Sequence, residues 1–235
     1  MDEHFARIYQ HQAEDYDQLV DKEDHEHNLR QRLLDLLAPG DWQEREVVEL
    51  GAGTGRLTRL LSPLVGRLRA FDASAAMLEV ARRRHDPRAD HVEFAIAAHH
   101  QIPLDDAVAD VAIEGWSFGH LAEGLPPSQG ADAVRRAMDE MTRLVRPGGM
   151  LVLIETLGTG QTTPAPPAPF LDRLYQDLEH QGFARQWCRT DYAFASLPQA
   201  RRLITFFFGA SMVEHLDPQT LILPECTGIW HRTRS

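Results

Sequence analysis

The chain has 235 residues, with 35 acidic and 24 basic side chains and a formal net charge of −11 at pH 7. A chain of this length can bury about 70–75% of the surface that it exposes when unfolded, so one domain with room for added elements is expected. The acidic balance argues against partners held mainly through phosphates, such as duplex DNA or an anionic membrane surface.

The N-terminal segment, residues 1–45, is predicted to form a helical cover. Residues 2–28 carry nine carboxylates. Apolar residues then recur at helical spacing over residues 29–37. The pair Pro39-Gly40 is expected to end this second helix.

Residues 46–156 change to short apolar runs separated by amphipathic stretches, which indicates βα units around a parallel sheet. Strands are predicted at 47–50, 68–71, 92–97, 108–113 and 150–155. Helices are predicted at 57–61, 74–84 and 132–145, and Arg146-Pro147-Gly148-Gly149 is expected to turn the chain into the fifth strand. The expected fold class is therefore a doubly wound, mostly parallel α/β sheet.

Residues 157–235 are predicted to be the second half of the same domain. The expected elements are helices at 171–181 and 197–208 and strands at 183–190 and 221–230. The proline-rich stretch 164–169 is too short to separate domains, and it is interpreted as a loop that acts as a lid. The triplet Phe206-Phe207-Phe208 is expected to form core or a substrate-pocket wall.

A glycine-rich turn after the first strand is the most informative motif of the chain. Gly51, Gly53 and Gly55 permit a tight turn and a close approach of a ligand to the backbone. Asp72 ends the next strand, where a nucleotide-binding βαβ unit carries its ribose acceptor. A dinucleotide site would have a glycine where this chain has Arg56. The carboxylate of Glu49 better suits a cofactor that presents an ammonium group.

The segment Glu49-Leu50-Gly51-Ala52-Gly53-Thr54-Gly55 resembles the first motif of the class I S-adenosylmethionine-dependent methyltransferases. Four further segments match that superfamily in order: 71–78, 101–105, 110–113 and 144–149. The resemblance covers residues 45–156 and is of the methyltransferase type 11, small-molecule kind. A Rossmann-like domain with another ligand is the alternative.

The resemblance implies a set of cofactor-binding residues for S-adenosyl-L-methionine. The backbone at Gly51 and Gly53 would line the methionyl group, and Asp72 would accept from the ribose hydroxyls. Ala73 and Met77 would flank the adenine, although helix packing explains Met77 nearly as well. The candidates are Tyr16, Glu49, Gly51, Ala52, Gly53, Gly55, Asp72, Ala73, Met77, Ala98, His99 and Gly115.

Two of these candidates carry particular consequences. Many relatives have an aspartate where this chain has Ala98, so the side-chain contact to the adenine amino group is in doubt. The backbone N–H of His99 could still serve the adenine ring. Tyr16 lies in an A-x-x-Y-D segment that resembles quinone-biosynthesis relatives, in which the tyrosine closes the site. Plain helix packing is an equal alternative for Tyr16.

Methyl transfer needs position and a deprotonated nucleophile, and a base only where the acceptor atom carries a proton. Candidates follow the fourth and fifth strands, because open α/β sheets bind ligands at the carboxyl ends of their strands. His120 is the first candidate for a general base, since imidazole titrates near neutral pH. Glu114 and His99 are further catalytic candidates, and Trp116 could form an apolar wall. Structural roles remain open for all of these residues.

Metal and disulfide sites are not expected. Cys188 and Cys226 fit neither a metal spacing nor a disulfide framework, and Cys226 is interpreted as a buried strand residue. His25 and His27 are two residues apart and would point to different helix faces, with no third ligand. No apolar run reaches the length of a membrane span, and residues 1–10 do not resemble a secretory signal, so a cytoplasmic protein is expected.

The expected function is S-adenosylmethionine-dependent methyl transfer to a small-molecule acceptor through an oxygen, nitrogen or carbon nucleophile. The fourth strand is not followed by the Asn/Asp-Pro-Pro-Tyr stretch of nucleic-acid amine methyltransferases. The expected partners are therefore a small molecule, with neither nucleic acid nor membrane, in a monomer or homodimer. The alternatives are an RNA or protein methyltransferase and a non-catalytic module that binds the cofactor.

Overall fold

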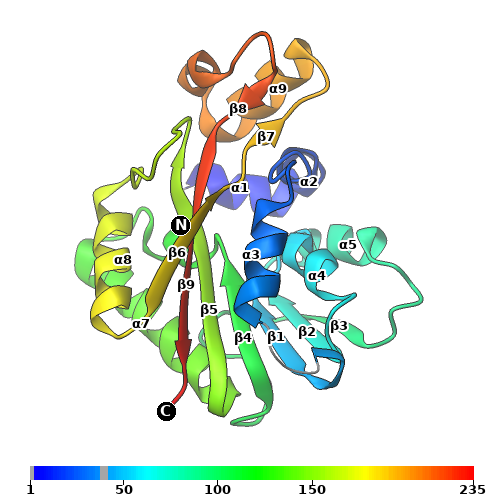
Figure 1. The fold of residues 1–235 in the computed structure, drawn as a ribbon, viewed down its shortest axis with the longest axis vertical. Helices are drawn as coiled ribbons and strands as arrows, with labels where there is room; N and C mark the ends of the chain where they lie inside the picture. The colour runs from blue at the N-terminus through cyan, green and yellow to red at the C-terminus, as the bar shows by residue number, and fades with distance from the viewer. Residues whose placement is uncertain (1–2, 38–41) are drawn as a thin grey trace.

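The computed structural model describes residues 3–37 and 42–235, and seven of its strands form one sheet (Figure 1). These strands are β1 (Glu46–Leu50), β2 (Arg67–Asp72), β3 (Val92–Ile96), β4 (Ala109–Gly115), β5 (Val145–Thr159), β6 (Ala184–Arg189) and β9 (Glu225–Thr233). Their order across the sheet is β3-β2-β1-β4-β5-β9-β6. The pairs from β3 to β5 are parallel, whereas β9 runs antiparallel to both β5 and β6. The prediction of a doubly wound, mostly parallel sheet is confirmed.

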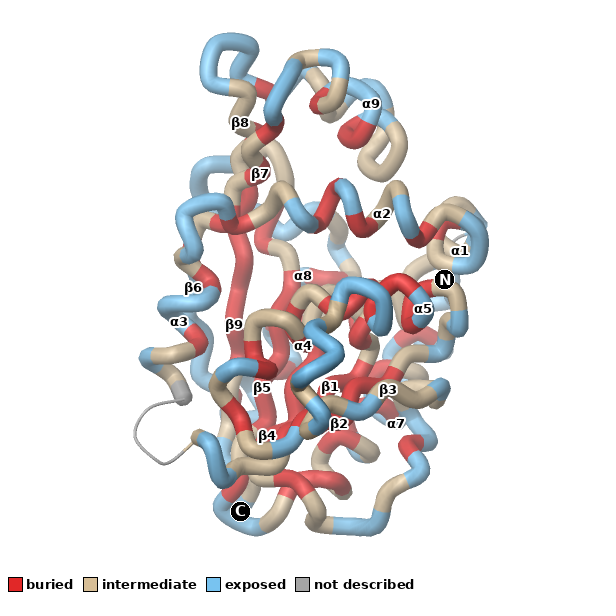
Figure 2. The backbone as a smooth tube through the Cα atoms, turned by 90° about the vertical axis from the view of Figure 1, so that its right-hand side faces the viewer, coloured by how far each residue is buried: buried red, intermediate tan, exposed pale blue. Residues whose placement is uncertain are grey.

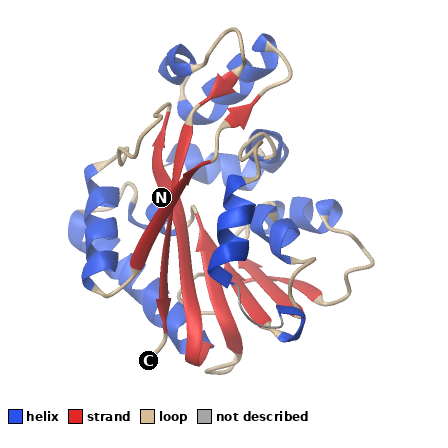
Figure 3. Ribbon diagram, viewed as in Figure 1, coloured by secondary structure: helices blue, strands red, loops and turns tan. Residues whose placement is uncertain are grey.

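Helices cover both faces of this sheet (Figure 3). The elements α3 (Asn28–Leu37), α4 (Arg56–Leu61) and α5 (Ala75–Arg84) lie on one face. The elements α7 (Pro127–Leu144) and α8 (Pro169–His180) lie on the other, and α6 (Phe118–Ala122) packs against both. Side chains alternate between faces along a strand, so Val47 packs with the α3 and α4 side and Val48 with the α7 side. Both are almost fully buried, as expected for a parallel sheet.

The elements of the structure differ from the predicted ones in three places. β5 begins at Val145, and residues 146–149 form a bulge of this strand instead of a turn that precedes it. Gly148 takes a φ of +82° there, and the pairing of β4 with β5 shifts register between Ala109 and Val111. The strand predicted at 221–230 is two elements, β8 (Ile222–Leu223) and β9, and helix α6 was not predicted at all. The predicted helix end at Pro39-Gly40 lies outside the described residues.

A second group of elements closes over the carboxyl ends of the parallel strands (Figure 1). It consists of α1 (Glu3–His11), α2 (Ala13–Val20), β7 (Tyr192–Ala193), α9 (Leu197–Phe208), the 3₁₀ helix η2 (Ala210–His215) and β8. Leu19 of α2 packs with Leu203 and Ile204 of α9, and all three are fully buried in one apolar cluster. Figure 2 shows these buried segments above the sheet. The N-terminal helices and the excursion between β6 and β9 therefore form one roof.

Among the described residues, none of the helices combines the length and the apolar character that crossing a bilayer would require.

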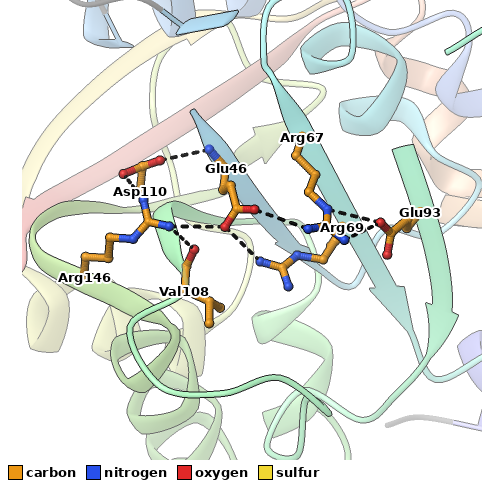
Figure 4. A network of polar contacts seen from close by, with 7 residues as sticks. All are labelled: Glu46, Arg67, Arg69, Glu93, Val108, Asp110 and Arg146. Atoms are coloured by element: carbon orange, nitrogen blue, oxygen red, sulfur yellow. Dashed lines mark hydrogen bonds and ion pairs between the residues drawn. The ribbon is translucent and has the colours of Figure 1, made fainter. Parts of the chain in front are cut away.

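The amino ends of the parallel strands carry a network of ion pairs (Figure 4). Glu46, at the start of β1, accepts from Arg67 at 3.4 Å, from Arg69 at 3.3 Å and from Arg146 at 3.2 Å. Arg146 also donates to Asp110 at 2.6 Å. One carboxylate thus joins the starts of β1, β2 and β5, and the side chain of Arg69 is only 10% exposed.

Replacing the central carboxylate should destabilise the fold. We expect Glu46→Gln to lower the free energy of unfolding by about 1–2 kcal/mol, between the values for exposed and buried ion pairs, because Arg69 loses its counter-charge. Denaturant titration measures this change. Asp132→Asn breaks an exposed pair with Arg135 and is the matched control, with little expected effect. Equal stabilities of the two variants would contradict the role of Glu46.

Candidate functional site

The glycine turn joins β1 to α4 through three residues with positive φ. Gly51, Gly53 and Gly55 have φ angles of +72°, +55° and +80°, which favour glycine over residues with a side chain. A Cβ atom on Gly51 would also lie 2.5 Å from the side chain of Ser117. The turn therefore needs glycine at Gly51 both for its conformation and for the close approach of the β4–α6 loop.

Glu49 lies on β1, on the face covered by α4, and is 1% exposed. Its Oε2 accepts a hydrogen bond of 2.6 Å from the hydroxyl of Thr58. Burial raises the pKa of Glu49 to about 8. A cation bound beside this buried carboxyl would stabilise its ionised form and would itself be held by the charge.

Asp72, at the end of β2, holds two turns together. Its carboxylate accepts from the N–H of Gly53 at 2.8 Å and from the N–H of Ser74 at 2.7 Å. Burial raises the pKa of Asp72. The Ser74 hydroxyl in turn donates to the carbonyl of Tyr9 at 2.6 Å, which attaches α1 to the start of α5. The ribose-acceptor candidate thus lies directly beside the glycine turn.

A cavity of about 400 Å³ lies between this edge of the sheet and the roof. Six predicted cofactor residues line it: Tyr16, Glu49, Gly51, Ala52, Gly53 and Gly115. The aromatic side chains of Phe5, Phe207 and Phe208 and the ring of Trp116 form much of its apolar wall. Tyr16 of α2 lies over Gly53, with a ring carbon 3.9 Å from the position of a Cβ on that glycine.

The other predicted cofactor residues lie outside the lining of this cavity. Ala73 is exposed beside Asp72, and Gly55 begins α4. Met77 is 2% exposed and packs with Ala13 and Val80 beneath the N-terminal helices. Ala98 forms an isolated bridge with Gln101. His99 is turned toward the β4–α6 loop, where its Nε2 lies 3.1 Å from the hydroxyl of Ser117.

The His99 ring is unsuited to carry a positive charge. Burial lowers its pKa to about 4, and the neighbouring His100 and His120 contribute to the same direction. Its edge faces Phe118, with ring centroids 5.5 Å apart. In this position, a neutral His99 supports the loop after β4.

His120 is the predicted catalytic residue that the structure brings into the cavity. Its Nδ1 lies 2.8 Å from a carboxylate oxygen of Glu123, one turn further along α6. An ionised carboxylate only accepts hydrogen bonds, so the proton belongs on Nδ1 and Nε2 is free to accept. Nε2 then accepts from the hydroxyl of Tyr9 at 2.9 Å. The contacts with Glu123 and Tyr9 orient the imidazole of His120 with its Nε2 on the α1 side.

Glu114, near the end of β4, and Glu155 of the neighbouring β5 lie on the same face of the sheet. Glu114 is fully buried, and one of its carboxylate oxygens accepts from the N–H and the hydroxyl of Ser117 and from the N–H of Phe118. Glu155 lines the cavity and accepts from the N–H of Gly119 at 2.8 Å. Burial raises both pKa values, that of Glu155 to about 7, and the neighbouring Glu155 raises that of Glu114 further. Both carboxyls hold the start of α6 and thereby position His120.

Sequence reasoning missed a polar group on another part of the cavity wall. Glu23, Arg56, Tyr192 and Glu225 all line the cavity. In the sequence, Arg56 stands out only because it replaces the last glycine of a dinucleotide motif. Glu123 could have been found from its helical spacing to His120, but nothing local links residues as distant as Glu23 and Tyr192.

In residues 3–37 and 42–235, no three or more His, Cys, Asp or Glu side chains gather in a way that could hold a metal ion. Both cysteines, Cys188 and Cys226, are buried free thiols.

Comparison with known proteins identifies a matching family. Residues 48–153 match the model of a methyltransferase domain. The chain is 31% identical over 129 residues to a demethylmenaquinone methyltransferase of Clavibacter sepedonicus, a match that covers 55% of this chain and 45% of that protein. It is 30% identical over 142 residues to a malonyl-[acyl-carrier protein] O-methyltransferase of Serratia marcescens, covering 57% and 46% of the two chains. The chain thus spans less than half the length of these relatives.

Solved structures show the same fold at low sequence identity. A structure described as a DhpI-SAM-HEP complex has a TM-score of 0.59 at 18% identity, over 98% of this chain and 96% of that chain. The YcgJ protein of Bacillus subtilis has a TM-score of 0.53 at 19% identity, over 87% and 97% of the two chains. Both similarities concern the fold, and they extend beyond the matched domain into the C-terminal half.

The buried carboxyls predict how stability depends on pH. Glu49 and Glu225 have pKa values raised to about 8 and Glu155 to about 7, whereas an unfolded glutamate ionises near pH 4.5. The folded state therefore holds more protons than the unfolded state, so stability falls as pH rises through the folded pKa values. We expect the free energy of unfolding to decrease by at least about 1 kcal/mol between about pH 6.5 and 8.5, a range in which His99 is neutral when folded.

Denaturant titrations at several pH values measure this dependence. Glu49→Gln removes one of the titrating groups, and its profile should be flatter than that of the parent chain. A stability that stays level or rises over this range would contradict the raised pKa values.

Proposed function

We propose that this chain belongs to the class I S-adenosylmethionine-dependent methyltransferase superfamily and transfers a methyl group from S-adenosylmethionine to a small-molecule acceptor. The observation that carries the proposal is the roofed cavity at the carboxyl edge of the sheet. Its volume of about 400 Å³ is of the size of small-molecule sites. Its wall joins the glycine turn of the superfamily motif to a histidine that can act as a base.

The residues around the glycine turn fit the chemistry of this cofactor. Glu49 offers a buried carboxylate to its ammonium group, and the backbone at Gly51 and Gly53 can be approached closely because these residues lack side chains. Asp72 would accept from the ribose hydroxyls. Tyr16, which lies over Gly53, would close the site.

The adenine end is the less complete part of this proposed site. Ala98 has no side-chain acceptor for the adenine amino group, which leaves the backbone of His99 to contact the ring. Ala73 is exposed beside Asp72 and can flank the adenine. Met77 is buried under α1 and α2, where it would support the site from below.

When bound, the cofactor supplies an electrophilic methyl group for in-line displacement. His120 would remove the proton from an acceptor atom that carries one, through Nε2, while Glu123 keeps the other ring proton on Nδ1. The hydroxyl of Tyr9 is hydrogen-bonded to Nε2 in this structure. A hydroxyl or amine of the methyl acceptor would replace Tyr9 as the partner of Nε2. Glu155, held by the N–H of Gly119, fixes the helix start that presents His120.

An acceptor on RNA or protein fits the roof less well. Phe5, Tyr16 and Phe207 close the cavity from above with mutual ring contacts of 5.2–5.5 Å between centroids. A nucleic-acid groove would also need basic side chains, whereas Arg56 and His120 are the basic residues of the cavity wall and both are paired with glutamates.

Loss of the Asp72 charge should weaken cofactor binding. We expect Asp72→Asn to reduce affinity for S-adenosylhomocysteine at least about ten-fold, the scale of losing hydrogen bonds to a charged group. Asparagine keeps one oxygen for the backbone N–H groups of the turn, so the fold should persist. Calorimetry measures the affinity, and Asp90→Asn at an exposed position is the control. Unchanged affinity would remove Asp72 from the ribose site.

Loss of the base should act on turnover and leave cofactor binding intact. With an acceptor found by screening metabolites for S-adenosylhomocysteine release, we expect His120→Ala to lower kcat by about 10²–10³-fold, the usual scale of general-base catalysis. Glu123→Gln should cost less, because the imidazole keeps its place but loses the partner of its Nδ1 proton. His180→Ala, at an exposed position of α8, is the control. A His120→Ala enzyme with full activity would exclude His120 as the base.

A further inference from the structure

Four residues from distant parts of the chain form one polar patch of the cavity wall, here called the acidic wall. It consists of Glu23 from the loop after α2, Arg56 from the start of α4, Tyr192 of β7 and Glu225 of β9. The roof and the sheet must both be in place to bring these residues together. None of them belongs to the glycine motif or to the Glu123–His120–Tyr9 arrangement.

Glu225 has hydrogen-bonding capacity that the described residues leave unused. The residue is 2% exposed and lines the cavity. Its Oε1 accepts from the hydroxyl of Thr156 at 2.6 Å, whereas its Oε2 forms no well-aligned hydrogen bond with the described residues, although the Thr159 hydroxyl lies close to the carboxyl. A buried polar atom without a partner costs about 1–3 kcal/mol, and more where the group is charged. A donor from a bound molecule would remove this cost.

Glu23 shows the same pattern on the other side of the acidic wall. Its side chain is 3% exposed, and its Oε2 accepts from Arg56 and from the hydroxyl of Tyr192. Its Oε1 forms no well-aligned hydrogen bond with the described residues, although the Thr190 hydroxyl lies close to the carboxyl. Two buried carboxylates thus each keep one oxygen without a well-aligned donor.

The acidic wall holds two carboxyl groups but one cation. Arg56 is the cation of this group, and it is paired with Glu23 while its guanidinium lies 4.2 Å from the centre of the Trp116 ring. Glu225 is left without a cation of its own. Burial and the neighbouring Glu23 raise the pKa of Glu225 to about 8, so this site gains stability from any added positive charge.

The rest of the cavity wall is apolar around this patch. Phe207, Phe208 and Met212 from the roof and Leu19 from α2 line the same cavity. Such a wall suits a molecule with an aromatic or aliphatic body, and a small number of polar groups then fixes its orientation.

We propose that the acidic wall binds a protonated amino group of the methyl acceptor, with Glu225 and the free oxygen of Glu23 as its partners. The acceptor is then an amphiphilic amine whose apolar body contacts the aromatic roof. This inference rests on the proposed function, because it assigns the substrate class of the same cavity. The free Nη2 of Arg56 would favour an anionic group instead, which makes an acid the competing ligand to test.

Three probes of one shape separate these possibilities. The full chain is saturated with S-adenosylhomocysteine, and its affinities for 2-phenylethylamine, 2-phenylethanol and 3-phenylpropionate are measured at neutral pH. We expect the amine to bind at least about ten-fold more tightly than the alcohol, and the acid most weakly. Equal or tighter binding of the alcohol or the acid would overturn the proposal, and so would the absence of measurable binding of all three probes.

One variant and a matched control assign the effect to Glu225. Glu225→Gln keeps the shape and an oxygen for Thr156 but removes the charge, and it should reduce the preference for the amine over the alcohol to near unity. Glu214→Gln removes an equal charge at an exposed position of η2 and should keep the preference. An intact preference in a folded Glu225→Gln variant would overturn the assignment. Should that variant fail to fold, the ranking of the three probes on the parent chain decides the proposal.

The first step of the experiment keeps the two proposals apart. Absence of S-adenosylhomocysteine binding to the parent chain would overturn the proposed function and this inference with it. Binding of S-adenosylhomocysteine without a preference for the amine would overturn the inference alone.

Discussion

Closure of the carboxyl edge of the sheet by polypeptide is the constraint on which the rest of the structure depends. Glu49, Glu114 and Glu155 lie on apolar strands near the site where the parallel pairing ends. The roof of α1, α2 and α9 leaves all three at most 3% exposed. Burial of a carboxylate is costly unless hydrogen bonds replace the lost water. Most polar contacts around the cavity supply these hydrogen bonds to the buried carboxyls.

The hydrogen-bonding capacity of the buried carboxyls is filled to different extents. Glu114 uses the backbone N–H groups of the helix start, and Asp72 uses those of two turns, so both stabilise loops. Glu225 and Glu23 are only half satisfied. A fold that leaves buried oxygens without donors gives up stability at those positions. Such unpaired groups in native structures are concentrated where a ligand completes the hydrogen bonding.

The sequence predicts the sheet well because its signals are local. Alternating buried residues, the glycines after β1 and the position of Asp72 at the end of β2 all follow from spacing along a βαβ unit. The position of His120 after β4 follows from the same topology. The start of β5 could not be predicted, because a proline and two glycines indicate a turn, whereas hydrogen bonds of Gly148 and Gly149 with Arg234 hold this segment against the chain that follows β9. The acidic wall depends on contacts over more than 160 residues, as between Glu23 and Tyr192, and no periodicity encodes these.

The amino and the carboxyl ends of the parallel strands also differ in how completely their charged side chains are paired. At the amino edge, Glu46 has three arginine partners and stays in contact with solvent, so its charge is compensated without any ligand (Figure 4). At the carboxyl edge, Arg56 is the cation next to Glu23 and Glu225, and it cannot compensate both. A second arginine beside Glu225 would stabilise the empty cavity, but it would also take the place that a cationic acceptor would need. Carboxylates with a full set of arginine partners therefore stabilise the amino ends of the strands. Carboxylates that lack such partners leave room for a cationic ligand at the carboxyl ends.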